Sequence, residues 1–298
     1  MDAFYIILTS ALFSVACGLL GCFLILRKMA MIGDAISHAV LPGIVIAFLI
    51  SGSRNSMEMI AGAAILGLLT SFMIEFFHKK AKLQTDAAIG VSFTSLFALG
   101  IILISLFAGQ VDLDQECVLY GEIAYVPLDL WITSKGMIMG PAPIYIAGFV
   151  LVLVLLFLML FYPQLKLTTF DAAFAKTLGI SAALWHYSLM GMVSITTVAA
   201  FDSVGAILVV ALFVVAPATA YMLTREMKTM LLLTVLLSVI NSILGYYLAV
   251  LINGSIAGAI VCISGLNFIL SFLFSPTEGL IVKRRKNRLK SLQAGFRT

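Results

Sequence analysis

Residues 142–162 read APIYIAGFVLVLVLLFLMLFY and contain no charged side chain. About 20 consecutive apolar residues allow a helix to cross the roughly 30 Å hydrocarbon core of a bilayer. Further apolar segments approach or reach this length near residues 3–26, 31–51, 57–77, 85–108, 184–200, 204–223, 229–251 and 256–275. The sequence therefore predicts an all-α, polytopic membrane protein with about nine transmembrane helices.

The composition of the whole chain excludes a water-soluble fold. Of its 298 residues, 62% are hydrophobic and only 11% are charged, whereas soluble domains average about 45–50% apolar and about 25% charged residues. So few polar side chains cannot cover a soluble globule, and lipid must cover much of the apolar surface. The four cysteines are scattered and match neither a disulfide framework nor a zinc motif.

Basic residues predict the orientation of the chain, because Lys and Arg near the ends of membrane spans remain on the cytoplasmic side. With an external N-terminus, all 18 Lys and Arg residues except Arg54 and Lys135 lie inside. We therefore expect the N-terminus outside and the C-terminus inside. Polar groups within 31–51 and 184–223 are typical of broken or re-entrant helices, which leaves eight spans as an alternative.

The chain divides into a transmembrane domain, residues 1–282, and a basic tail, residues 283–298. The tail is expected to contact anionic headgroups of the lipid bilayer on the cytoplasmic face. No nucleic-acid partner is expected for a charged run attached directly to a membrane helix. A cytoplasmic segment at about 163–183 separates two spans and is longer than a bundle turn requires, which predicts a function for it.

Residues 110–135 form an acidic segment on the predicted outer face. Asp112, Asp114, Glu116 and Glu122 lie within it, and their carboxylates could attract cations, so they are candidate residues of an outer gate. The simpler interpretation is a solvated loop with a short surface helix.

Asp34 and His38 are the most informative polar residues within a predicted span. They are four residues apart and therefore share one face of a helix. A carboxylate oxygen and an imidazole nitrogen can together bind a divalent Mn, Fe or Zn ion. The missing ligands would come from elsewhere in the chain, from solvent or from a second copy. The alternative is a structural Asp–His hydrogen bond that only fixes helix packing. Pro42 and Gly43 follow closely and permit a kink.

Other polar or small residues favour structural interpretations. Asp202 is expected to cap the helix that follows it. Interfacial positions are expected for Glu75, His78 and His186. A GxxxG pattern predicts close helix contact on the last span, through Gly254 and Gly258.

The sequence contains no motif of an enzyme or of an energy source. It has no GxxxxGK[ST] phosphate loop, no Gly-x-Ser-x-Gly elbow and no HExxH pair. Isolated polar groups within a membrane favour a transport path over catalysis.

Three segments give the chain a family resemblance: RKMAMIGDAISHAVLPG at 27–43, DQECVLYGE at 114–122, and 201–218, which begins FDSVGA and ends APA. They resemble the membrane permease subunit of bacterial manganese/zinc/iron ABC importers, the ABC-3 family. This resemblance covers nearly the whole chain. It implies the ABC importer permease fold, a location in the bacterial cytoplasmic membrane and no enzymatic activity in this chain.

The same resemblance implies roles for two groups of residues. Asp34 and His38 match positions that line the metal path where two permease subunits meet. The segment FDAAFAKTLGI at 170–180 resembles the part that docks into the ATPase, with Phe170, Asp171, Phe174, Ala175 and Gly179 as its coupling residues. The implied partners are cytoplasmic ABC ATPase subunits, a second permease subunit of the same or a homologous chain, and an extracellular metal-binding protein.

No permanently bound cofactor is expected, and the metal is the cargo. The stretch Leu119–Glu122 looks more like manganese permeases than zinc permeases, so Mn²⁺ is favoured, with Zn²⁺ or Fe²⁺ as alternatives. Zn²⁺ binds a given N/O site more tightly than Mn²⁺, so a manganese path must discriminate by geometry. Two alternatives of other classes remain: a secondary metal transporter driven by an ion gradient, and a binding or signalling membrane scaffold that moves no ion.

Overall fold

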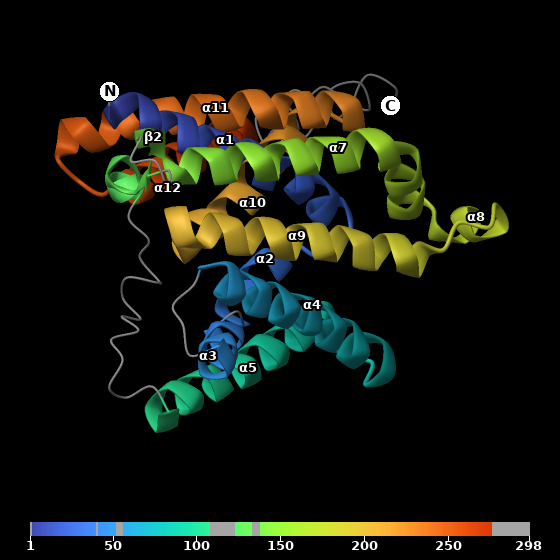
Figure 1. Cartoon of the computed structure of the whole chain (residues 1–298). Helices are drawn as coiled ribbons and strands as arrows, with labels where there is room; N and C mark the ends of the chain where they lie inside the picture. Colours follow the sequence, from blue (N-terminus) through green and yellow to red (C-terminus); the bar gives the residue numbers. More distant parts are fainter. Residues whose placement is uncertain (1, 40, 52–55, 108–122, 133–137, 276–298) are drawn as a thin grey trace, which may run out of the picture.

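The computed structural model describes residues 2–39, 41–51, 56–107, 123–132 and 138–275 (Figure 1). The first half contains α1 (Asp2–Leu26), α2 (Ile32–Ala39), α3 (Leu41–Ser51), α4 (Ser56–Lys80) and α5 (Thr85–Phe107), followed by η1 (Ile123–Leu128), β1 (Leu130–Ile132) and β2 (Ile138–Pro141). The second half contains α7 (Ala142–Phe170), α8 (Ala172–Thr177), α9 (Ala182–Val204), α10 (Ala206–Leu223), α11 (Met227–Ile252) and α12 (Ile256–Phe274).

Eight helical segments of the described residues are long and apolar enough to cross a membrane. They are α1, the α2–α3 segment at Ile32–Ser51, Ala61–Lys80 of α4, α5, α7, Ala182–Phe201 of α9, α11 and α12. Helix α10 adds a shorter apolar segment, Ile207–Leu223. The predicted all-α polytopic architecture is confirmed, and the predicted count of nine corresponds to these eight segments plus α10.

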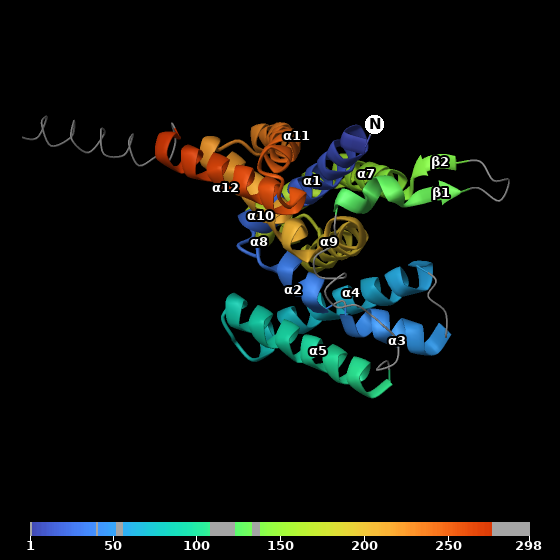
Figure 2. The same cartoon turned by 90° about the vertical axis from the view of Figure 1, so that its left-hand side faces the viewer.

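Helix α1 occupies the centre of the larger group of helices. It packs against α7, α9, α10 and α11, and its side chains Phe13, Leu20 and Phe23 are fully buried. Helices α2, α3, α4 and α5 form a second group on the far side of α9 and α10 (Figures 1 and 2). The buried core therefore lies along α1, α9 and α10, whereas most of the surface of α5 is exposed.

The span expected at 31–51 is divided into α2 and α3, which agrees with the expectation of a broken helix. Pro42 is the second residue of α3, where a proline is tolerated because the first N–H groups of a helix have no intrahelical partner. A Cβ atom added to Gly43 would lie 2.5 Å from the carbonyl oxygen of Gly62 on α4, and the reverse also holds. These glycines therefore allow α3 and α4 to approach each other closely.

The boundaries of two helices correct the sequence interpretation. Residues 163–170, expected in the cytoplasmic segment, continue α7 as a helix. Leu165 and Thr168 are buried on this extension, so packing stabilises it despite Pro163. The prediction that Asp202 caps a helix is wrong, because Asp202 lies within α9 and Gly205, with φ 79°, stands at the junction with α10.

Two further expectations also need correction. Gly254 and Gly258 do not mediate contact between helices, because Cβ atoms added there would meet only Ile252 and Ser255 of the adjoining turn. The segment predicted to lie on the outer face contains η1, in agreement with the short helix expected there, but it also contains an antiparallel β1–β2 pair that was not predicted.

Several connections between helices meet at one end of the molecule. One cavity there is lined by residues of the α1–α2 turn, the α4–α5 turn and the α7–α9 region, including Arg27, Thr85 and Ala172. A second cavity is lined by Lys166 and Phe170 together with Arg225–Lys228, at the end of the α10–α11 connection and the start of α11. The segment 170–180 begins at this end of the molecule, because Phe170 and Ala172 line these two cavities.

Candidate functional site

Asp34 and His38 lie together on α2, as their spacing predicts. The His38 Nε2 atom is 3.4 Å from Asp34 Oδ1, and the two side chains are 30% and 26% exposed. The neighbouring Ile32, Ala35 and Ile36 are buried. The helix therefore buries its apolar face and leaves a carboxylate and an imidazole partly exposed on the opposite face.

Two aromatic rings of α5 position the imidazole of His38. The Phe93 and Phe97 ring centroids each lie 5.9 Å from that of His38, with interplanar angles of 35° and 81°. Such packing restricts the ring rotation of His38 and leaves its nitrogen directed toward Asp34. An ordered imidazole loses less conformational freedom on binding an ion.

Ser37 does not join this pair, although it lies between the two residues in sequence. It is buried, and its hydroxyl donates a hydrogen bond to the Gly33 carbonyl at 2.9 Å. Within the described residues, no group of three or more His, Cys, Asp and Glu side chains has the geometry of a metal site. If Asp34 and His38 bind a metal ion, the other ligands must therefore come from solvent or from another chain.

The segment 170–180 forms a short helix that stands clear of the bundle (Figure 1). Asp171 caps α8, because its Oδ1 atom accepts a hydrogen bond from the Phe174 N–H at 2.8 Å. The helix ends at Thr177, and Gly179 follows the C-cap residue Leu178 with a left-handed φ of 76° that suits glycine. Ala175 is fully buried and anchors the turn.

Phe170 and Phe174 are exposed aromatic residues of this segment, at 59% and 52% exposure, and Leu178 is also exposed. They do not share one helix, because Phe170 ends α7 and Phe174 belongs to α8. The extended backbone of Asp171 lies between them, with φ −146° and ψ 85°. An apolar partner surface would therefore contact both the end of α7 and the face of α8.

The four candidate residues of the outer gate, Asp112, Asp114, Glu116 and Glu122, lie outside the described residues. The segment that follows them begins at η1 and continues into the β1–β2 pair, where Trp131 packs edge-on against Tyr145 of α7 at 5.2 Å between ring centroids.

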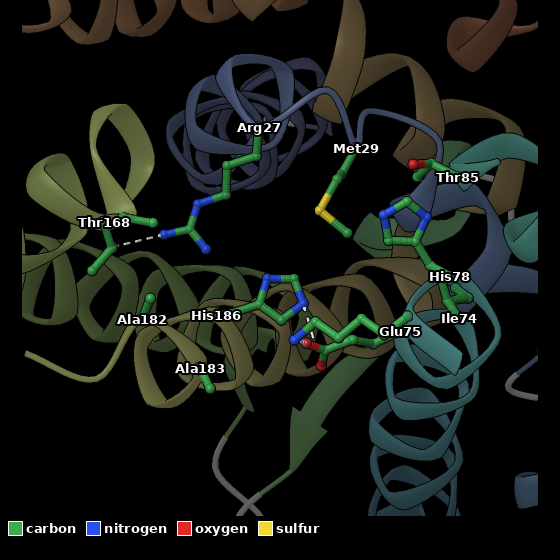
Figure 3. A pocket seen from close by; sticks show the side chains of 12 residues that line it. Arg27, Met29, Ile74, Glu75, His78, Thr85, Thr168, Ala182, Ala183 and His186 are labelled. Carbon is green, nitrogen blue, oxygen red and sulfur yellow. Dashed lines mark hydrogen bonds and ion pairs between the residues drawn. The ribbon is translucent and has the colours of Figure 1, made fainter. Parts of the chain in front are cut away.

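A polar cluster at the end of the bundle was not predicted from the sequence (Figure 3). The carboxylate of Glu75 on α4 accepts from Lys79 through Oε1, and its Oε2 lies 3.9 Å from His186 Nε2 on α9. The cavity of about 310 Å³ beside them is also lined by Arg27 and Thr168. His78 faces the same cavity but bonds through Nδ1 to the Leu83 carbonyl at 2.9 Å.

Comparison with known proteins places these features in a family. Residues 3–275 match the model of the ABC 3 transport family. The chain belongs to the ABC 3 transport family.

Similar members of the ABC 3 family include transport proteins for different metals. The chain is 48% identical to the manganese transport system membrane protein MntD of Bacillus subtilis, over 94% of each chain. It is 43% identical to the zinc transport system membrane protein TroD of Treponema pallidum, over 93% of this chain and 75% of that one.

The ABC 3 fold is also recognised among solved structures. PsaBC from Streptococcus pneumoniae in complex with Fab matches with a TM-score of 0.75 and 32% identity, over 92% of this chain and 91% of that chain. The predicted membership of this family and its predicted fold are therefore confirmed.

Proposed function

We propose that this chain is the permease subunit of an ATP-binding-cassette importer that moves Mn²⁺ inward across the bacterial cytoplasmic membrane. The observation that carries this proposal is the 48% identity to a manganese transport membrane protein over 94% of both chains. As a permease subunit, the chain forms the path and catalyses no reaction itself. ATP hydrolysis then takes place on separate partner chains.

Asp34 and His38 are proposed to hold the ion during its passage. A carboxylate and a neutral imidazole suit a divalent first-row metal, and their 3.4 Å separation with partial exposure allows both to reach one ion. Two permease subunits would bring two such pairs to a shared axis. Four ligands, completed by water, approach the roughly six-coordinate geometry that favours Mn²⁺ over tetrahedral Zn²⁺.

The segment 170–180 is proposed to dock into the ATPase. Its support is the exposure of Phe170 and Phe174 on a capped helix that projects from the bundle. The orientation proposed from the sequence, with the C-terminus inside, places this segment in the cytoplasm. Basic residues at the same end of the bundle, such as Arg27, Lys79 and Arg225, support that orientation.

The decisive measurement is transport by the reconstituted complex of this chain with its ATPase and metal-binding partners. We expect Mn²⁺ loaded on the delivery protein to stimulate ATP hydrolysis and to accumulate in proteoliposomes only when ATP is present. Equal stimulation by Zn²⁺ or Fe²⁺ would reassign the cargo within the family. Uptake driven by an ion gradient without ATP would overturn the importer proposal in favour of a secondary transporter.

A further inference from the structure

Arg27 connects two segments that have separate roles in the proposed transport cycle. It lies in the turn between α1 and α2, and its side chain crosses to the end of α7. Its Nε donates to Thr169 Oγ1 at 3.0 Å and its Nη2 to Thr168 Oγ1 at 3.1 Å. The two threonines directly precede Phe170, the last residue of α7 and the first of the segment 170–180.

The turn that carries Arg27 is hydrogen-bonded to the end of α1 and to the start of α2. Backbone hydrogen bonds run from the N–H groups of Arg27, Lys28 and Met29 to carbonyls in the last turn of α1, and from the Ile32 N–H to the Met29 carbonyl. Lys28 adopts a left-handed conformation, with φ 60°. The turn that carries Arg27 therefore leads directly into the start of α2, where Asp34 is the third residue.

Arg27 is a partly buried cation that binds neutral oxygens. Burial lowers the pKa of its guanidinium to about 10, so the group remains charged at neutral pH. Within the described part of the chain, no carboxylate forms an ion pair with it. Its two bonds to hydroxyls are weaker than a paired carboxylate would provide, which suits a contact that must form and break.

A second contact joins the neighbouring helices at the same end. His186 lies near the start of α9, just after the segment 170–180, and its Nε2 is 3.9 Å from Glu75 Oε2 on α4. The Glu75 side chain is only 8% exposed, and its carboxylate also interacts with the hydroxyl of Tyr187 on α9. This carboxylate faces the cavity that Arg27 also lines, as Figure 3 shows.

Helix α4 also contacts α2, the helix that carries Asp34 and His38. A Cβ atom added to Gly67 of α4 would lie 3.1 Å from Ile36 Cγ2 of α2 and 2.1 Å from Ser194 Oγ of α9. The three helices thus approach closely along α4. The contact of α4 with α9 at Glu75 and His186 therefore provides a second mechanical path from the segment 170–180 to α2.

We propose that Arg27, Thr168, Thr169, Glu75 and His186 form a polar joint that transmits movement of the segment 170–180 to the Asp34–His38 helix. Arg27 is its central positioning residue. It holds the end of α7 against the start of α2 and acts on the metal only through α2. This inference rests on the proposed function, because it assigns the route by which an ATPase would open that metal path.

The test compares Arg27→Met with Lys28→Met in the reconstituted complex of this chain with its ATPase and delivery protein. Both substitutions replace a basic side chain of the same turn by methionine. Lys28, however, is exposed and is not one of the residues of the polar joint. We expect Arg27→Met to reduce Mn²⁺-stimulated ATP hydrolysis and Mn²⁺ uptake by about tenfold, within the usual range of coupling between sites. Lys28→Met should retain both activities. Binding of Mn²⁺ to the Arg27→Met complex should stay within about twofold of wild type, because Asp34 and His38 are unchanged.

A second pair of variants distinguishes the loss of the Arg27 hydrogen bonds from a general defect in folding. Thr168→Val with Thr169→Val removes both acceptors of Arg27 and should reproduce the loss of coupling, whereas Thr168→Ser with Thr169→Ser keeps both hydroxyls and should restore it. If the valine pair retains full Mn²⁺-stimulated hydrolysis, the joint does not transmit movement and the inference is overturned. A wild-type complex without any Mn²⁺-stimulated hydrolysis would instead contradict the proposed function itself, so the two failures are distinguishable.

Discussion

At the scale of single residues, the proposed metal path depends on the Asp34 carboxylate. We expect Asp34→Asn to weaken Mn²⁺ binding by at least about tenfold, because even the loss of an outer-shell partner typically costs 10–100-fold in metal affinity. Isothermal titration of the purified complex with Mn²⁺ measures this change. Asp86→Asn is the matched control, since Asp86 is an exposed carboxylate in the first turn of α5.

Asp86→Asn should leave the affinity for Mn²⁺ unchanged. If Asp34→Asn binds Mn²⁺ as tightly as wild type, the Asp34–His38 contact is a structural hydrogen bond, which is the alternative that the spacing of these residues leaves open.

Local spacing predicted contacts within one helix but not contacts between helices. The four-residue interval between Asp34 and His38 was sufficient to predict that they lie side by side. In the structure, His38 Nε2 is 3.4 Å from Asp34 Oδ1. This spacing could not show that the rings of Phe93 and Phe97 pack against the imidazole of His38. The pairing of Glu75 with His186 was equally inaccessible, because it depends on how α4 crosses α9. Both residues were interpreted as interfacial for that reason.

At the scale of elements, the short helix α8 should act through its exposed aromatic residue. We expect Phe174→Glu to abolish Mn²⁺-dependent ATP hydrolysis in the reconstituted complex, because a carboxylate in an apolar interface must be desolvated without a partner. Phe174→Leu, which keeps an apolar side chain, should retain most of the activity. Mn²⁺ binding should persist in both variants, because α8 is separate from α2.

Unchanged uptake in Phe174→Glu would contradict docking at this segment and would favour a transporter that needs no ATPase. The sequence predicted this element through Asp171 and Gly179, whose capping roles are local and are present in the structure. It did not predict that residues 163–170 continue α7 as a helix through Pro163, which the burial of Leu165 and Thr168 stabilises. Packing of this kind, between residues that are distant in the chain, cannot be recognised from the local sequence.

At the scale of the whole molecule, the apolar composition determined that the chain spans a membrane, and the basic residues predict which end lies inside. The structure offers two matched positions for testing that orientation. Lys82 connects α4 to α5 and Asn253 connects α11 to α12, and both are exposed turn residues with left-handed backbones, at φ 53° and φ 49°. A cysteine should therefore be tolerated similarly at each position.

Labelling of these two positions in intact cells would test the proposed topology. In a background without the native cysteines, a membrane-impermeant thiol reagent should modify Asn253→Cys but should modify Lys82→Cys only after the cells are lysed. The reason is that Lys82 lies in the turn adjoining the basic end of α4, whose Lys79 and Lys80 favour the cytoplasm. The opposite pattern would place the segment 170–180 outside, where no ATPase could reach it, and the entire coupling scheme from Phe174 through Arg27 to Asp34 would have to be abandoned.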